Sequence, residues 1–382
     1  GMRRKERPMA REHKRDDSPR LRGICRRDFL KLAAAAGLLA GCRPHQQPTP
    51  TPVLSEAEGP TTVPTATPTS APTATPLPPR PEIIQFYPDV PSKVVRARHG
   101  GVWDGEELVV EAIRQMLDGS ITELTGLDDA REAWASLFAP GERIAIKVNA
   151  FRNSLIWTHV PLVVAVTECL QDVGVPVEQI VIFDYYTSEL EEAGYPVNED
   201  GSGVRCYGTD DNYTAGWQLV GSDIRLSDIL LGCDALINMP VLKAHMIAGI
   251  SFAMKNHYGT FGRPQNFHRP RIERAIAELN ALAPIKDRTR LIIGDVLTAC
   301  LRYASSYPYW QSDMIGDSIL MSFDPVAHDT VGLQMFSQLL TDDGGDPATA
   351  TSWANPWLEN GAELGLGTND PDNMDLVEVS LR

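Results

Sequence analysis

Apolar and polar positions alternate along residues 83–382 in a pattern that separates short buried strands from amphipathic helices. Runs such as RIAIKV and QIVIFD are apolar and β-branched on both faces, which is typical of parallel strands that helices cover on both sides. The pattern predicts strands at 93–98, 143–148, 179–183, 235–239, 290–293 and 319–323, and helices at 106–117, 161–173, 227–231, 271–282 and 325–340.

Strands that alternate with helices favour right-handed crossovers and an open, twisted sheet. The expected fold class is therefore α/β, with a mostly parallel sheet (or sheets) and flanking helices, in one domain or in two joined subdomains. In such sheets ligands gather at the carboxyl ends of the strands.

Composition divides the chain into three segments. Residues 43–82 hold 12 of the 29 prolines and are rich in threonine, so they favour extended polyproline conformations that bury almost no surface. We expect a signal peptide at 1–41, a disordered Pro/Thr-rich linker at 42–82 and the α/β domain at 83–382.

Residues 25–42, CRRDFLKLAAAAGLLAGC, have the layout of a secretory signal. Arg26 and Arg27 resemble the twin-arginine export motif, and the apolar run at 32–40 is too short to span a bilayer. LAGC resembles a lipobox, in which Cys42 becomes the lipidated first residue; the alternative is a cleaved signal with a chance cysteine. We expect export to the cell envelope and anchoring to a membrane through Cys42.

The charge of the remaining chain argues against nucleic acid as a partner. Residues 1–41 carry 12 basic and 5 acidic groups, so the total of 35 basic and 50 acidic leaves 23 − 45 = −22 for residues 42–382. A surface of that sign repels phosphate backbones.

Two windows depart from this acidity, because 143–167 and 235–272 contain no Asp or Glu. Each window covers a predicted strand end, and neighbouring parallel strands deliver such ends to one edge of the sheet. The loop after Pro240 is expected to lead into an apolar helix whose N-terminal amides add donors. The basic and polar side chains of the two windows are Lys147, Asn149, Arg152, Thr158, His159, Lys243, His245, Lys255, Asn256 and His257.

These residues predict a positive pocket for an anionic small molecule or cofactor. Lys243 or His245 would move a proton, and Lys147 and Lys255 would stabilise negative charge. The ligand-binding set is Lys147, Asn149, Thr158, His159, Lys255 and Asn256. Structural alternatives stay open: Lys255 at the negative end of a helix, Lys243 paired with a carboxylate, and the histidines as ordinary core or surface residues.

Two carboxylates also follow predicted strands. Asp295 comes after LIIG and Asp324 lies in SFDPVAHD, where either could orient a base or hold a divalent metal ion. The alternatives are a turn for Asp295 and a helix N-cap for Asp324 before Pro325.

The other motifs narrow the chemistry. The chain has no GxSxG, HExxH, GxxxxGK[ST] or GxGxxG sequence and no CxxC, so we expect no iron–sulfur cluster from this chain alone. The remaining cysteines are expected to be buried apolar residues or a disulfide pair: Cys169, Cys206, Cys233 and Cys300.

KVN, T-H-x-P, INMPVLKAH, AGISFAMKNHYG and SFDPVAHD resemble the family called domain of unknown function 362, from about Lys93 to the C-terminus. The resemblance implies no defined activity, and several relatives carry CxxC-rich ferredoxin-like segments that this chain lacks. We expect an exported lipoprotein that is an enzyme or a cofactor-binding redox accessory with a redox partner protein. The alternative is a non-catalytic solute-binding or surface lipoprotein.

Overall fold

The computed structural model describes residues 91–382. The predicted signal peptide, the predicted linker and the predicted lipidation site Cys42 lie outside the described residues. In the part from residue 91 onward, no helix combines the length and the apolar character needed to cross a bilayer.

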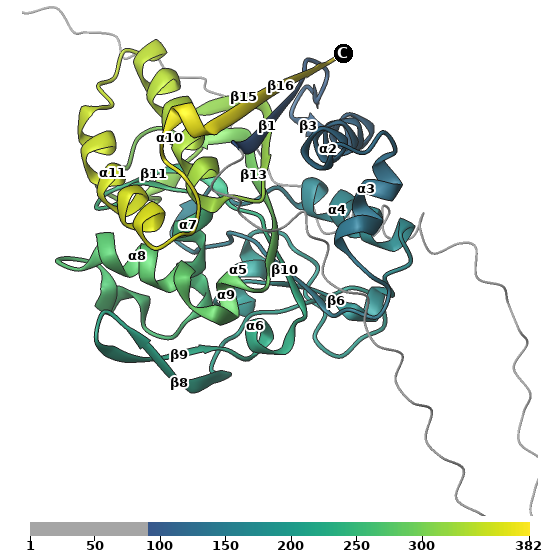
Figure 1. Cartoon of the computed structure of the whole chain (residues 1–382), viewed down its shortest axis with the longest axis horizontal. Coiled ribbons are helices and arrows are strands. Elements are labelled where there is room, and N and C mark those ends of the chain that lie inside the picture. The colour runs from purple at the N-terminus through teal and green to yellow at the C-terminus, as the bar shows by residue number, and fades with distance from the viewer. Residues whose placement is uncertain (1–90) are drawn as a thin grey trace, which may run out of the picture.

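A ten-stranded sheet forms the centre of the molecule, in the order β16-β1-β15-β13-β10-β4-β6-β7, with β11 and β12 attached beside β13 (Figure 1). Only β15 within the main order runs antiparallel to its neighbours, and β12 is antiparallel to β11. The expected mostly parallel α/β sheet is therefore confirmed. The strands are β1 (Ser92–His99), β4 (Ile144–Lys147), β6 (Ile180–Phe183), β7 (Arg205–Cys206), β10 (Ala235–Asn238), β11 (Val241–His245), β12 (Gly249–Ser251), β13 (Thr289–Cys300), β15 (Met314–Ser322) and β16 (Met374–Leu381).

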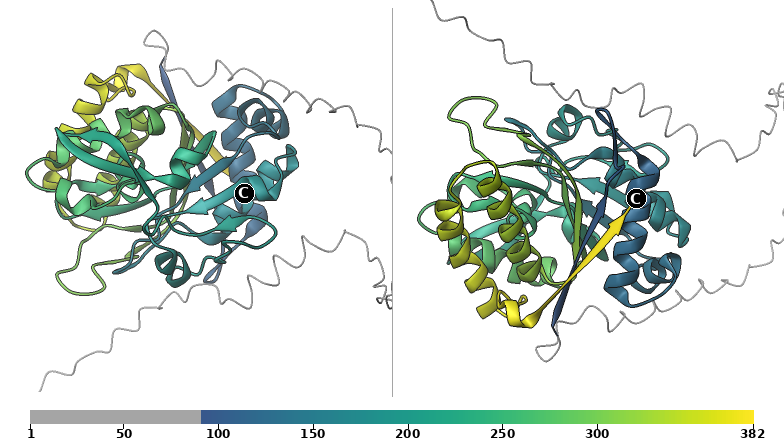
Figure 2. Two further views of the ribbon diagram at one scale, coloured as in Figure 1. Left: turned by 90° about the horizontal axis from the view of Figure 1, so that it is seen from below. Right: turned by 90° about the horizontal axis from the view of Figure 1, so that it is seen from above.

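Helices cover both faces of the sheet, as the two edge-on views show (Figure 2). One layer holds α2 (Val110–Thr125), α3 (Ala130–Leu137) and α4 (Val160–Asp172). The opposite layer holds α7 (Ala253–Asn256), α8 (Ile272–Ala281), α9 (Ala283–Lys286), α10 (Pro325–Asp342) and α11 (Ala348–Glu363). Shorter helices are α5 (Thr187–Glu192) and α6 (Asp228–Gly232).

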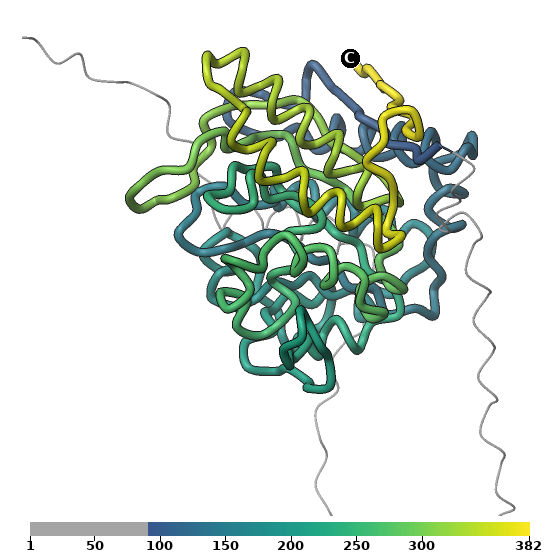
Figure 3. Tube along the Cα trace, turned by 60° about the vertical axis from the view of Figure 1, so that its left-hand side comes forward, coloured from purple at the N-terminus to yellow at the C-terminus, as the bar shows by residue number. Residues whose placement is uncertain are grey.

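Three small ribbons complete the described chain: β2 (Trp103–Asp104) with β3 (Glu107–Leu108), β5 (Ser154–Leu155) with β14 (Trp310–Gln311), and β8 (Tyr213–Leu219) with β9 (Ser222–Ser227). The connection from β13 to β15, which contains β14, projects from the body as a loop (Figure 3).

The two-residue period of the strands assigns side chains to the two cores. In β4, Ile144 and Ile146 pack with the α2–α4 layer, whereas Ala145 packs with the α7–α11 layer. Lys147 has the parity of Ala145, so its side chain points to the layer that contains α7. A lysine at the end of an otherwise apolar strand thereby becomes fully buried.

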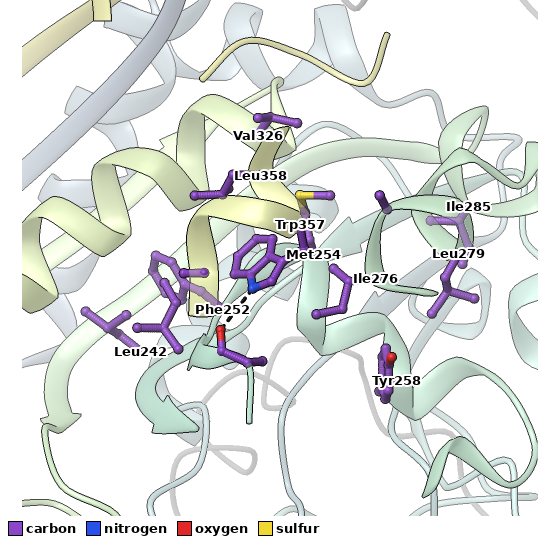
Figure 4. Packing of buried hydrophobic residues seen from close by; sticks show 14 of the residues in the cluster. Leu242, Phe252, Met254, Tyr258, Ile276, Leu279, Ile285, Val326, Trp357 and Leu358 are labelled. Atoms are coloured by element: carbon purple, nitrogen blue, oxygen red, sulfur yellow. Dashed lines mark hydrogen bonds between the residues drawn. The ribbon is translucent and has the colours of Figure 1, made fainter. Parts of the chain in front are cut away.

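Packing of α11 fixes the hairpin that carries the candidate site. Trp357 is fully buried and its Nε1 donates a 2.9 Å hydrogen bond to the carbonyl of Ala248, between β11 and β12 (Figure 4). Gly249 has φ +79°, and a Cβ there would overlap the carbonyl oxygen of Ala350. Glycine is thus required both by the turn and by the close approach of α11.

The expectation of an apolar helix after Pro240 is wrong. The segment forms the β11–β12 hairpin and then the single turn α7, because β11 pairs with β13. The first amides of α7, from Ala253 and Met254, both donate to the buried carboxylate of Asp329 at 2.8 Å. They are therefore not available to a ligand.

Candidate functional site

A cavity of about 500 Å³ lies where the carboxyl ends of β4 and β6 meet the β11–β12 hairpin and α7. β4 and β10 are neighbours in the sheet, but the chain continues from β4 to β6 on one side and from β10 toward β13 on the other. The two connections diverge and leave a crevice between them. We call it the lysine cavity, and seven residues singled out from the sequence line it: Lys147, Asn149, Arg152, Lys243, His245, Lys255 and Asn256.

Lys147 is committed to internal contacts. Its Nζ lies 2.6 Å from Asp184 Oδ1, 2.6 Å from the carbonyl of Val148 and 3.4 Å from Asn256 Oδ1. These three acceptors match the three donors of an ammonium group. Although Lys147 lines the cavity, the carboxylate of Asp184 already balances its charge.

Lys243 is placed differently. Its Nζ donates a 2.6 Å hydrogen bond to Asn149 Oδ1 and lies 5.4 Å from the ring centroid of Trp310. No carboxylate lies within ion-pair distance among residues 91–382, so the sequence-based alternative of a carboxylate pair is wrong for Lys243. Burial lowers the pKa of its ammonium from 10.5 to about 8, with Lys147 lowering it further and Asp184 opposing this.

Lys255 lies on α7, with its Nζ 3.3 Å from the centroid of the Tyr258 ring. In the described part of the chain it has neither a carboxylate partner nor a hydrogen-bond acceptor. Burial, and then the ammonium groups of Lys243 and Lys147, hold its pKa well below the usual value for lysine. Lys255 is thus not simply the capping charge of a helix, since α7 is only four residues long.

Three amide side chains connect these lysines. Asn149 Nδ2 donates to Asn256 Oδ1 at 3.1 Å, and Asn256 Nδ2 donates to Asn238 Oδ1 at 2.8 Å. The chain from Asn238 at the end of β10 to Lys243 on β11 therefore passes through both predicted asparagines. Their side chains fix the positions of Lys147 and Lys243, and Asn149 also faces the cavity.

His245 holds the hairpin turn. Its Nδ1 lies 3.3 Å from the amide of Ile247 and 3.2 Å from that of Ala248, so this nitrogen is the acceptor in a neutral ring. Burial, with Lys255 second, keeps its pKa well below 6.5. The predicted proton-transfer role is therefore better suited to Lys243 than to His245.

Comparison with known proteins agrees with the motifs. The model of the domain of unknown function DUF362 matches residues 144–334, which is half of the chain. The chain belongs to the DUF362 family. The matched range includes every residue that lines the lysine cavity, so the cavity is part of the DUF362 domain itself. A search among curated proteins returns no match.

Two solved structures resemble the DUF362 chain weakly. The lactate racemase apoprotein from Thermoanaerobacterium thermosaccharolyticum has a TM-score of 0.37 and 11% identity, covering 64% of this chain and 57% of that one. A protein from Thermotoga maritima has a TM-score of 0.36 and 10% identity, covering 68% and 60%. The chain spans less than two thirds of either length, and neither likeness informs its function.

Thr158 and His159 do not line the lysine cavity, and their assignment as ligand-binding residues stays a prediction. Thr158 Oγ1 donates to the carbonyl of Met239 and accepts from the amide of Asn149, so it joins the segments after β10 and β4. His159 precedes the first residue of α4, and its Nδ1 lies 2.7 Å from Oδ2 of Asp295. Both side chains therefore make hydrogen bonds within the fold.

The metal assignment of Asp295 and Asp324 is not supported. Asp295 lies inside β13, fully buried, and accepts from the ring and the amide of His159 and from the amide of Leu297. Asp324 caps α10, accepting from the amides of Val326 and Ala327. No group of three His, Cys, Asp or Glu suited to a metal occurs among the described residues.

The sequence analysis missed two acidic residues that line the lysine cavity, Asp184 and Glu189. Asp184 directly follows β6, just as Lys147 lies at the end of β4. A search for polar residues at the carboxyl ends of the predicted strands could therefore have found it. Glu189 lies on α5, 3.7 Å from Arg152, and burial followed by Asp184 raises its pKa to about 7. The four described cysteines are buried and free, so no disulfide forms among them.

Proposed function

We propose that the lysine cavity binds an anionic small molecule and that Lys243 transfers a proton to or from it. The proposal rests on the observation that Lys243 and Lys255 are buried in one cavity without carboxylate partners in residues 91–382. Lys147, in contrast, forms an ion pair with Asp184. A carboxylate or phosphate group is the natural partner for such ammonium groups.

Energetics support this proposal. Burying an ammonium group without a counter-charge destabilises the folded protein, and two such groups in one cavity also repel each other. A bound anion would relieve both effects. The cavity volume of about 500 Å³ falls in the range of small-molecule sites.

Lys243 is the group best suited to proton transfer. With a pKa of about 8 it exchanges a proton near neutral pH, whereas an ordinary lysine stays charged. The alternative function, binding of an anionic solute without chemistry, is favoured by the internal hydrogen bonds that occupy Lys147 and His245. Turnover of a bound ligand would distinguish an enzyme from such a binding protein.

Binding can be measured by calorimetry and thermal shift with inorganic phosphate, acetate and pyruvate. Lys243→Met and Lys255→Met should each weaken binding by roughly 1.5–3 kcal/mol, the usual contribution of a charge-assisted hydrogen bond. The matched control is Lys286→Met, because Lys286 is exposed at the end of α9. Equal affinity in all three variants would reject the anion site.

We also propose that the chain is exported and lipid-anchored through Cys42, with the Arg26–Arg27 motif as its export signal. Mass spectrometry of the protein from its native host should find acylated Cys42 as the mature N-terminus. Replacing both arginines by lysine should block export. An unmodified mature chain that begins elsewhere would reject the anchor.

A further inference from the structure

Lys255 is the most unusual of the lysines in residues 91–382. The five are Lys93, Lys147, Lys243, Lys255 and Lys286, of which three are buried. Lys147 and Lys243 each donate to an oxygen at 2.6 Å, whereas Nζ of Lys255 makes no hydrogen bond within residues 91–382 and lies 3.3 Å from the centroid of the Tyr258 ring. Lys255 also lines the cavity, so a ligand can reach it.

An amine in this position is prepared for nucleophilic attack. Among the described residues no hydrogen-bond donor engages its lone pair and no acceptor fixes its protons. Burial, and then the neighbouring ammonium groups of Lys243 and Lys147, disfavour a positive charge on it. Desolvation beside another cationic group is a recognised way to activate a lysine toward carbonyl compounds.

We propose that Lys255 forms an imine with the carbonyl carbon of an oxo acid whose anionic group is held by Lys243. This proposal rests on the proposed function, since the anion site provides the second point of attachment. It narrows the ligand class to a 2-oxo or 3-oxo acid.

The bonding changes balance without an oxidant or reductant. The lone pair of neutral Lys255 Nζ forms the new C–N bond while the carbonyl π electrons move to oxygen. That oxygen leaves as water with two hydrogens, one from Nζ and one from the Lys243 ammonium group. The products are a protonated imine at Lys255, water and neutral Lys243, so atoms and the single positive charge are conserved.

The surroundings suit the product as well as the reactants. The protonated imine keeps its positive charge at Nζ, where the face of the Tyr258 ring stabilises a cation. Lys243 becomes neutral at the same step, so the two nitrogens never carry a positive charge at the same time. Neutral Lys243, beside Asn149, then accepts a proton from the attacking water during hydrolysis, which regenerates its ammonium group and the neutral amine of Lys255.

The test is reductive trapping of the full chain with borohydride in the presence of pyruvate or acetoacetate. Peptide mapping should find an adduct on Lys255 equal to the oxo acid minus one oxygen atom. Lactate and 3-hydroxybutyrate, which lack the carbonyl, should give none. Trapping at Lys255 should exceed that at exposed Lys286 by more than about tenfold at neutral pH, because each unit of pKa lowering raises the neutral fraction tenfold.

Lys255→Arg places a cationic hydrogen-bond donor at this position but cannot form the imine, so it should abolish trapping while acetate binding persists. No adduct at Lys255 with either oxo acid, or trapping there no greater than at Lys286, would overturn the proposal. If acetate still binds the wild-type chain in that case, the proposed anion site survives and only the covalent step fails. Loss of acetate binding as well would reject both.

Discussion

Replacing Lys243 by Met tests whether the buried, unpaired charge of Lys243 destabilises the folded protein. Methionine has a similar length but no ammonium group, and it leaves Asn149 Oδ1 facing the cavity. The pKa of Lys243 is lowered from 10.5 to about 8 in the folded chain. The destabilisation is therefore fully present below pH 8, where both states carry the proton, and it disappears as pH rises from 8 to 10.5.

The magnitude follows from linkage. A difference of about 2.5 pKa units corresponds to about 3 kcal/mol between the protonation states. Raising the pH from 7 to 9.5 should therefore increase the free energy of unfolding by about 2 kcal/mol. Lys243 is only 3% exposed, so solvent screening removes little of the effect.

The assay is urea denaturation of the wild type, Lys243→Met and Lys286→Met at both pH values in buffers without small anions. Relative to Lys243→Met, the wild type and the Lys286 control should gain about 2 kcal/mol of unfolding free energy on going to pH 9.5. Saturating acetate should remove this difference by restoring the pKa of Lys243. Identical pH dependence in the wild type and Lys243→Met would refute the reasoning.

Three further substitutions test the framework of the cavity by denaturation. Gly259→Ala should lower stability by about 3 kcal/mol, because a Cβ there would overlap the buried Lys147–Asp184 pair; full stability would contradict this contact. Asp324→Ala should lower it by about 2 kcal/mol through loss of the α10 N-cap, and Asp324→Asn should recover part; no change would reject the cap. Trp357→Phe should lose about 1–2 kcal/mol with the hydrogen bond to the hairpin, and an unchanged midpoint would show that this bond contributes nothing.

The predicted strands and helices were found wherever one sequence period dominates a segment. The apolar runs at 143–148, 179–183 and 235–239 became β4, β6 and β10 within two residues of their ends. Prediction failed where tertiary contacts decide the structure. Residues 290–293 extend into a twelve-residue β13 because β15 and β11 pair with its second half. Helix α11 was missed because Pro356 lies inside it.

The sequence predicted which residues lie at the candidate site better than it predicted the role of each residue. Strand-end position and the absence of acids brought out Lys147, Lys243 and Lys255, which the structure places around one cavity. Those signals could not show which lysine has a counter-charge, since Asp184 lies 37 positions from Lys147 in the chain. They also could not show that Thr158 is turned toward Met239 rather than toward a ligand.

The three lysines of the cavity differ in what their charges contribute to folding, and this difference is the strongest argument for function. Lys147 and Asp184 neutralise each other inside the sheet, as a structural pair does. Lys243 and Lys255 keep the fold at lower stability than apolar side chains of the same volume would give, because nothing in the described chain balances them. Their cavity is open to small molecules, and anions would recover the lost stability on binding. A buried charge that destabilises the empty protein and is relieved by a ligand is expected at a binding or catalytic site, where stability is exchanged for affinity.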